Sequence, residues 1–303
     1  MIKTIVTTTI NKPTEALVKF SKMKGWNLVV VGDKKTPHNY FKNNKDIVYL
    51  SPNDQEKISK KLSDLIGWNC IQRRNFGFIY ANKIKSDIVA SVDDDNIPYK
   101  NWGKNLLVGK KNLTRVFKNS HGVFDPLSVT EHKNILWHRG FPLEFIKNSK
   151  PKFIGKKLLN CSVQADLWNG DPDIDAICRI ANSPNIKFKK FDCFTSKNKS
   201  PFNSQNTFID AKYLKYYYMF PHIGRMDDIW GSYFFQEKVK HSKGYIVYSN
   251  ASVYQFRNKH NLVKDLEGEI YGYKFNAKVL KHGVFKYLPK RSIASYLEYK
   301  KNF

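Results

Sequence analysis

The 303-residue sequence has only four cysteines, few arginines and no long hydrophobic stretch. Cys70, Cys161, Cys178 and Cys193 are far apart and form no Cys-x-x-Cys pair, which argues against a zinc site and a disulfide framework. No apolar run approaches the roughly 18 residues that a membrane-spanning helix needs. The first residues predict a β-strand and not a signal peptide, so we expect a soluble, cytoplasmic protein.

The strong positive charge of the chain comes mostly from lysine and little from arginine. The formal net charge is +26, but 44 of the 52 basic residues are lysines and only eight are arginines. The lysines are spread along the chain and belong to no recognisable nucleic-acid-binding module. We therefore expect an anionic partner such as a nucleotide-sugar, an acidic glycan or a membrane surface, and no nucleic acid.

The first hundred residues alternate between short apolar runs and helical patterns. Strands are predicted at 2–9, 26–31, 46–50 and 86–92, and helices at 13–24, 56–65 and 72–85. This alternation predicts an α/β fold with a mostly parallel central sheet flanked by helices. The Gly-x-Gly-x-x-Gly sequence of dinucleotide-binding proteins is missing after the first strand.

After about residue 110 the alternation becomes irregular. We interpret 1–110 as the nucleotide-binding half and 111–275 as the acceptor-side half of one domain, followed by a basic C-terminal tail at 276–303. Residues 195–206 are rich in lysine, asparagine and serine and predict an exposed loop. The tail mixes lysine with leucine, phenylalanine and tyrosine, which fits either a helix on the core or a weak membrane-surface anchor.

Three consecutive carboxylates, Asp93, Asp94 and Asp95, end the predicted strand at 86–92. Adjacent like charges repel, and a hard divalent cation with phosphate oxygens as further ligands neutralises them well. Open α/β sheets bind ligands at the carboxyl ends of their strands, where we expect these residues. The pattern predicts a nucleotide-sugar site with Mn²⁺ or Mg²⁺, and the alternative is a solvated acidic turn.

Two further segments supply candidate nucleotide contacts. Arg74 and Asn75 open the helix predicted before the aspartates, and free N–H groups and guanidinium groups bind phosphate there. Thr8 ends the first predicted strand, and Asp33 and Lys35 follow the second. A carboxylate at that place can accept from a base or a ribose, and a lysine can meet a phosphate. An ordinary helix start and a Gly/Pro turn are the alternatives.

A second acidic pair, Asp227 and Asp228, opens another predicted helix, where the helix dipole partly explains the two charges. An enzyme that transfers a sugar with inversion also needs a carboxylate base to deprotonate the attacking hydroxyl. We predict Asp228 as this base, with Asp227 as its substitute. Trp230 is a candidate platform for a sugar ring, and Arg225 is a candidate contact to the acceptor or to a phosphate.

Two other segments are weaker candidates. Asp171 and Asp173 lie in a Gly/Pro-rich turn and are candidates for binding sugar hydroxyls, with a capped turn before a helix as the alternative. The glycine and the final glutamate of an EF-hand calcium loop are missing. His260 offers an imidazole that can bind a metal, although a lone histidine is more often a surface residue.

Together these segments resemble the GT-A glycosyltransferases, and more narrowly the STELLO-type family, with plant reversibly glycosylated polypeptides (UDP-arabinopyranose mutases) as more distant relatives. The matching segments are VGDKKTP at 31–37, DDDN at 93–96, GDPDIDA at 170–176, DDIWG at 227–231 and RNKHN at 257–261. The resemblance implies a GT-A fold (Rossmann-like), a UDP-sugar donor, and Mn²⁺ or Mg²⁺ bound through Asp93 and Asp95. It also implies that His260 completes the metal shell.

The resemblance adds a role for Arg139. The sequence RGFP at 139–142 is similar to the R-G-Y-P segment of the mutase relatives, whose arginine can carry a sugar. Arg139 is thus a candidate donor-site or self-glycosylated residue. The leading hypothesis is a metal-dependent, inverting glycosyltransferase with a hydroxyl acceptor such as a glycan. The alternatives are a mutase-like or self-glycosylating enzyme acting on a UDP-sugar, and a non-catalytic glycan-binding protein with the same fold.

Overall fold

The structure is a computed structural model that describes residues 1–132, 135–182, 184–242, 244–256 and 261–303. The strands are β1 (Lys3–Thr9), β2 (Asn27–Gly32), β3 (Ile47–Leu50), β4 (Ile88–Val92), β5 (Asn96–Pro98), β6 (Lys111–Lys118), β7 (Lys152–Gly170), β8 (Phe194–Ser196), β9 (Asn206–Asp210) and β10 (Gly244–Gln255). The helices are α1 (Glu15–Ser21), α2 (Asn39–Lys42), α3 (Pro52–Ile66), α4 (Arg74–Lys83), α5 (Ala176–Asn182), α6 (Asp227–Val239), α7 (Leu262–His282) and α8 (Lys290–Lys300).

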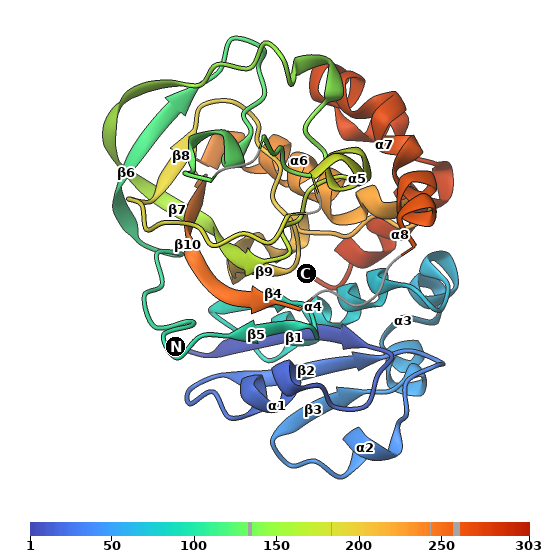
Figure 1. Ribbon diagram of the computed structural model, residues 1–303. Coiled ribbons are helices and arrows are strands. Elements are labelled where there is room, and N and C mark those ends of the chain that lie inside the picture. The colour runs from blue at the N-terminus through green and yellow to red at the C-terminus, as the bar shows by residue number, and fades with distance from the viewer. Residues whose placement is uncertain (133–134, 183, 243, 257–260) are drawn as a thin grey trace.

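The first half has the predicted alternation of strands and helices. Strands β3, β2, β1 and β4 lie side by side in this order, and all their pairings are parallel. Local signals fix the helix starts: Thr14 caps α1, and Ser51 with Asp54 forms a capping box at α3. The α/β class predicted from the sequence is confirmed for this half, which lies at the bottom of Figure 1.

Alternating strand residues pack into two separate core layers. Val29 and Val31 of β2 pack with Leu62 and Phe76 from α3 and α4, whereas Val30 packs on the other face with the α1 side. Successive side chains of a strand point to opposite faces, so a sheet covered by helices on both faces needs apolar residues at every position. The continuous apolar runs of these strands follow from this packing.

The second half of the chain is mixed, and the parallel arrangement of the first half does not extend into it. Strand β9 runs antiparallel to both β4 and β7, and β6 runs antiparallel to β7. Strand β7 also pairs with β10 in parallel, while β8 joins β6 to β10. The pairings of β7, β6, β8 and β10 therefore close on themselves, as the upper part of Figure 1 shows.

Residues 195–206 differ from the exposed loop that was predicted. Phe202, Asn203, Ser204 and Gln205 are buried, and the segment leads directly into β9. The Ser204 N–H and hydroxyl donate to Asp228, and the carbonyl oxygens of Ser204 and Gln205 accept from side chains of other elements. The predicted exposure was wrong because a polar sequence does not reveal partners supplied by distant elements.

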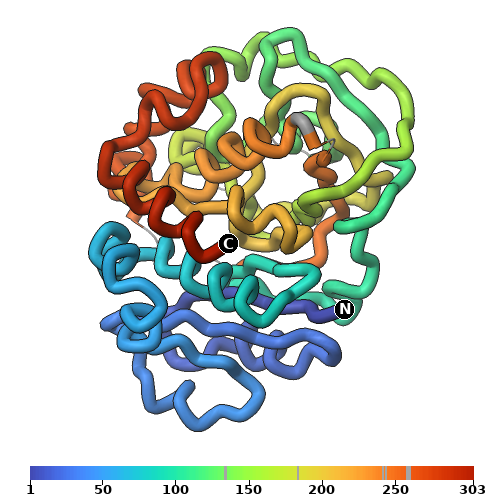
Figure 2. The backbone as a smooth tube through the Cα atoms, turned by 180° about the vertical axis from the view of Figure 1, so that it is seen from behind, coloured from blue at the N-terminus to red at the C-terminus, as the bar shows by residue number. Residues whose placement is uncertain are grey.

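The C-terminal residues form two helices that pack on the body of the protein. Helix α7 runs across the boundary predicted at residue 275, and α8 packs against α3 (Figure 2). The Tyr299 hydroxyl donates to the carbonyl oxygens of Leu214 and Tyr217, each at 3.0 Å. The C-terminal tail is therefore helical and packs on the core, which was the first of the two alternatives. No helix in the described part of the chain has both the length and the hydrophobicity needed to cross a bilayer.

Candidate functional site

The acidic residues predicted from the sequence surround one cavity at the carboxyl end of β4. This cavity, the acidic cavity, has a volume of about 220 Å³. Asp93 and Asp95 line it from the turn between β4 and β5, and Asp227 and Asp228 line it from the first turn of α6. Four carboxylates from distant parts of the sequence thus face one small space, at the edge where α/β sheets bind ligands.

A neighbouring cavity of about 280 Å³ adjoins the acidic cavity, because Ile71 lines both. Its lining includes Thr8 at the end of β1, Asp33 after β2, and Asp94. The three consecutive aspartates are therefore divided, with the first and third at the acidic cavity and the second at the neighbouring one. Lys35 is exposed in the turn after β2.

Asp33 and Asp94 order the loops around the neighbouring cavity. The two carboxylate oxygens of Asp33 accept from the backbone N–H groups of Lys34 at 2.6 Å and Cys70 at 3.0 Å. Asp94 Oδ2 accepts from the Thr9 hydroxyl at 2.5 Å and from the Asn11 amide at 3.1 Å. Both carboxylates thus have a structural task in addition to any contact with a ligand.

Arg74 holds Asp93 in place from the protein interior. Its guanidinium group is 1 % exposed and donates to Asp93 Oδ1 at 2.7 Å and to the Ser204 carbonyl oxygen at 2.8 Å. Burial raises the pKa of Asp93, and the ion pair with Arg74 opposes this rise. Arg74 does open α4 as predicted, but it acts on the acidic turn and is not exposed to bind a phosphate.

Asn75 is also inside the protein. Its side-chain amide donates to the Met219 carbonyl oxygen at 2.9 Å and accepts from the Met219 N–H at 3.0 Å. The side chain is fully buried, so its polar atoms tie α4 to the segment before α6. This geometry does not support the nucleotide contact predicted for Asn75.

The two carboxylates of the second pair have different partners. Asp228 faces the guanidinium group of Arg139, with 3.0 Å between Nη1 and Oδ1, and accepts from the Ser204 N–H at 2.9 Å. Asp227 Oδ2 accepts from the Gln72 side chain at 2.9 Å. Burial and the neighbouring Asp228 raise the pKa of Asp227 to about 7, and Arg139 opposes the rise. Asp227 is therefore the carboxylate of this pair that is suited to accept a proton near neutral pH.

Arg139 has all of its guanidinium nitrogens committed. Nε donates to Asp173 Oδ1 at 2.7 Å, Nη2 donates to Asp173 Oδ2 at 2.9 Å, and Nη1 donates to the Arg225 carbonyl oxygen. Burial alone would lower the pKa of Arg139, but Asp173 and Asp228 raise it well above its usual value. This buried, bidentate geometry leaves no nitrogen positioned to carry a sugar, which does not fit a self-glycosylated Arg139.

The other candidates for sugar contacts are also engaged by the protein. Asp173 is 1 % exposed, and the ion pair with Arg139 lowers its pKa far below the usual range against the effect of burial. Asp171 pairs with Arg179. Asp175 accepts from the Cys178 N–H at 2.8 Å at the start of α5. The capped-turn alternative therefore describes this segment, and the sugar contacts of Asp171 and Asp173 stay a prediction.

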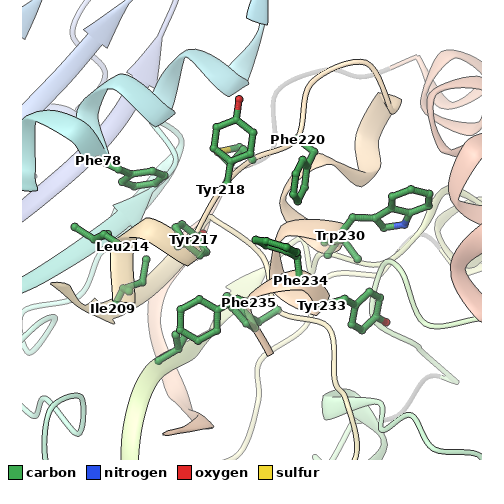
Figure 3. Close-up of a cluster of buried hydrophobic side chains, with 14 of the residues drawn as sticks. Phe78, Ile209, Leu214, Tyr217, Tyr218, Phe220, Trp230, Tyr233, Phe234 and Phe235 are labelled. Carbon is green, nitrogen blue, oxygen red and sulfur yellow. The ribbon is translucent and has the colours of Figure 1, made fainter. Parts of the chain in front are cut away.

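Trp230 has no exposed ring face. It is completely buried in the aromatic cluster of Figure 3, and its indole N–H donates to Asn276 at 2.8 Å. Trp230 follows Asp227 by three residues, so the two lie on neighbouring positions of the helix surface. The Trp230 side chain nevertheless packs into the core and against α7, away from the acidic cavity. The sugar platform predicted for Trp230 does not fit this position.

Arg225 lines the acidic cavity and is held by α7. Its Nη1 lies 3.2 Å from Asp265 and its Nε donates to Glu269 at 3.1 Å. Gly224 permits this close approach: its φ is +62°, and a Cβ there would lie 2.0 Å from the Gly268 carbonyl oxygen. Glycine therefore lets the 3₁₀ helix η5 (Gly224–Met226) pass directly against α7 and present Arg225.

Four polar lining residues of the acidic cavity were not predicted: Gln72, Ser204, Gln205 and Gln255. Strand β9 explains two of them, because it is antiparallel to β4 and so begins where β4 ends. The Asp93 N–H donates to the Gln205 carbonyl oxygen at 3.2 Å. The polar residues just before the apolar run of β9 were a hint in the sequence that this segment lines a site. They could be placed at the site only once the pairing of β9 with β4 was known.

The donor atoms at the acidic cavity are of the kind that Mg²⁺ and Mn²⁺ bind. Asp93 and Asp95 supply carboxylates, and the side-chain amide oxygens of Gln205 and Gln255 are buried with no hydrogen-bond donor among the described residues. Hard divalent cations prefer such oxygen ligands. Within the described ranges, no three His, Cys, Asp or Glu residues form a ready metal cluster. His260 lies outside the described residues.

The chain is similar to two proteins of Arabidopsis thaliana. It is 24% identical over 206 residues to the probable glycosyltransferase STELLO2, and 24% identical over 191 residues to the probable glycosyltransferase STELLO1. These matches cover 63% and 58% of this chain, but only 26% and 24% of the relatives, so the chain spans about a quarter of their length. No family model matches the sequence. The resemblance to the STELLO-type family, inferred first from the motifs, is confirmed by these two relatives.

Proposed function

We propose that the protein is a metal-dependent glycosyltransferase of GT-A fold that moves a sugar from a nucleotide-sugar, with UDP as the nucleotide, to an acceptor hydroxyl with inversion. The observation that carries this proposal is the acidic cavity. Asp93 and Asp95 meet Asp227 and Asp228 at the carboxyl end of β4 in a protein whose net charge is +26. Concentrated carboxylates in so basic a chain favour a bound cation and a carboxylate base. The similarity to two probable glycosyltransferases supports the reaction class.

The donor occupies both cavities in this proposal. The nucleoside would lie in the neighbouring cavity near Thr8 and Asp33, with Lys35 at its entrance, and the diphosphate would lie near Ile71, which lines both cavities. Asp93 and Asp95, with the amide oxygens of nearby glutamines, would hold Mn²⁺ or Mg²⁺. When bound, such a cation offsets the charge that develops on the leaving nucleoside diphosphate.

Asp227 takes the role of base in the proposal, in place of Asp228. The carboxylate accepts the proton of the acceptor hydroxyl while the hydroxyl oxygen forms a bond to the anomeric carbon and the bond from that carbon to the diphosphate breaks. A pKa raised to about 7 suits this proton transfer, and the hydrogen bond from Gln72 orients the group. Asp228 is committed to Arg139 and Ser204 and acts as a positioning residue.

The two alternatives receive less support. A self-glycosylating or mutase-like enzyme requires an accessible Arg139, whose nitrogens are all bonded within the protein. Binding of a glycan without catalysis does not require a carboxylate such as Asp227, whose pKa is raised, beside an acidic turn. Incubation with a labelled UDP-sugar and no acceptor separates these cases, because label that stays on the protein would favour self-glycosylation.

Calorimetric titration of UDP, with and without Mn²⁺, tests the donor site. We expect tight binding only with Mn²⁺, and a loss of the metal-dependent part of the affinity in Asp95→Asn. Asp64→Asn is a matched control, because Asp64 is an exposed carboxylate on α3. Equal binding of UDP with and without metal would contradict the proposal. Absence of UDP binding, followed by absence of GDP and CDP binding, would favour the glycan-binding alternative.

A further inference from the structure

One face of the β6–β7 ribbon exposes apolar side chains in register. Leu113 and Leu158 are direct cross-strand partners and each is 63% exposed. Partners in register point to the same side of a sheet, so the two leucines form one apolar surface. Phe153, which is 47% exposed, continues this surface beside Phe117 at a ring distance of 5.7 Å.

Cations surround the leucines on the same face. Lys111 lies two residues before Leu113, and Arg115 lies two residues after it, opposite Lys156. The Arg115 guanidinium group lies 5.5 Å from the centre of the Phe153 ring. Lys156 also pairs with Asp192 at 3.0 Å, on an exposed part of the chain. We call this surface, made of Lys111, Leu113, Arg115, Phe153, Lys156 and Leu158, the ribbon face.

The two sequence segments that form the ribbon contain no acidic residue. Residues 96–124 contain six lysines and arginines and no aspartate or glutamate, and residues 145–165 contain five and none. The two segments thus carry eleven positive charges and no negative one, and the ribbon lies in Figure 1 on the side away from β3 and α2. Exposed leucines flanked by lysines and Arg115 match the two parts of an anionic bilayer surface, its headgroup charge and its acyl region.

We propose that the ribbon face docks the protein on the surface of a membrane that contains anionic lipids. The lysines and Arg115 meet the headgroups, and Leu113, Leu158 and Phe153 enter the boundary of the acyl chains. The inference stands apart from the reaction proposed for the acidic cavity and does not depend on it.

Two other occupants fit the ribbon face less well. Single-stranded nucleic acid is bound by phosphate contacts and by stacking on several aromatic rings, whereas the ribbon face has one aromatic side chain, Phe153, and two leucines at its centre. A second copy of the chain in a symmetric dimer would bring the same cations of both copies together, which costs free energy. An anionic bilayer satisfies both the apolar and the charged side chains.

Sedimentation of the full chain with vesicles tests the proposal. The vesicles contain phosphatidylcholine alone, or phosphatidylcholine mixed with phosphatidylglycerol. We expect binding to the mixed vesicles at low salt, little binding to phosphatidylcholine, and weaker binding as salt rises. The double variant Leu113→Ser/Leu158→Ser should bind about ten-fold or more weakly. Val263→Ser/Leu297→Ser, which changes exposed apolar residues of α7 and α8, is the matched control and should bind like the wild type.

A second pair of variants tests the charge and remains informative if the leucine variant does not fold. Lys111→Gln/Lys156→Gln should weaken binding about five-fold for each charge removed. Lys42→Gln/Lys45→Gln removes two exposed lysines at and after α2 and should have little effect. Equal loss in both lysine pairs, equal binding to the two vesicle types, or stronger competition by RNA than by vesicles would overturn the proposal. Dimers in light scattering that the leucine variant disperses would do the same.

Discussion

The two carboxylate pairs of the acidic cavity face the same space but are held in different ways. Asp93 and Asp95 follow a strand end in a tight turn, and Asp93 keeps 17% of its side chain exposed while Arg74 supports it from inside. Asp227 and Asp228 begin a helix and are 5 % exposed or less; Asp228 shares the cation Arg139 with Asp173, whereas Asp227 accepts a hydrogen bond from Gln72.

This difference separates the tasks of chemically identical groups. Asp93 keeps part of its carboxylate exposed at the cavity, as a cation would require. In the buried pair, one carboxylate takes the ion pair and the other gains proton affinity, because two adjacent negative charges with one cation cannot both be fully stabilised. Environments that push the pKa values of neighbouring carboxylates apart are typical of acid–base sites.

The largest expected effect follows from removal of the buried base. Asp227→Asn should lower turnover about 10²- to 10⁴-fold, the usual contribution of a general base, while nucleotide binding stays intact. The measurement is product formation from a UDP-sugar together with UDP titration. Asp87→Asn, at an exposed carboxylate before β4, is the control. Full activity of Asp227→Asn would return the role of base to Asp228.

Removal of Arg139, which forms ion pairs with Asp173 and Asp228, should lower the stability of the protein. Arg139→Met leaves Asp173 and Asp228 without their shared cation, and loss of one member of a buried ion pair costs about 3–5 kcal/mol. Urea unfolding monitored by tryptophan fluorescence measures this change. Arg225→Met is the matched variant and should cost less, because the Arg225 side chain is 30% exposed. Similar losses of unfolding free energy in the two variants would mean that the ion pairs of Arg139 contribute no more to stability than those of Arg225.

The pH dependence of the reaction sharpens the contrast further. Burial and Asp228 raise the pKa of Asp227 to about 7, and a base must be deprotonated to act. Turnover should therefore fall below pH 7, by about ten-fold per pH unit well below it, and level off at higher pH. A profile of kcat at saturating donor measures this, and a flat profile from pH 5 to pH 8 would argue against Asp227 as base.

The smallest expected effect concerns the neighbouring cavity. Lys35→Ala removes an exposed side chain from the entrance of the proposed nucleoside site. It should weaken UDP binding only a few-fold, because an exposed charge contact contributes up to about 1 kcal/mol. Titration at two salt concentrations tests this, since the loss should shrink at high salt. Lys24→Ala, an exposed lysine between α1 and β2, is the control.

Local patterns predicted the first half of the fold and the acidic turn well. The apolar run into Asp93 gave β4, and the carboxylates at 227 and 228 marked the start of α6. These features depend on residues that are close in the sequence. The prediction for the helix start at Arg74 was correct for the same reason.

The partners of individual side chains could not be predicted in this way. Asn75, Trp230 and Arg139 carry polar groups that suggested ligands, yet each finds its partner at a residue more than 30 positions away. Ser204 reaches the site only because β9 runs antiparallel beside β4. Such contacts depend on the tertiary pairing of strands, which periodicity along one chain does not encode.

The pairing of β4 with β9 has a consequence for synthesis on the ribosome. Val89 pairs with Ile209, so one edge of β4 stays open until the chain has grown past β9. Until then the nascent protein presents a hydrophobic strand with unpaired backbone groups, which is a template for aggregation. The strand that carries the acidic turn is thus completed late, and we expect this stage of translation to be the one at which the growing chain depends most on chaperones.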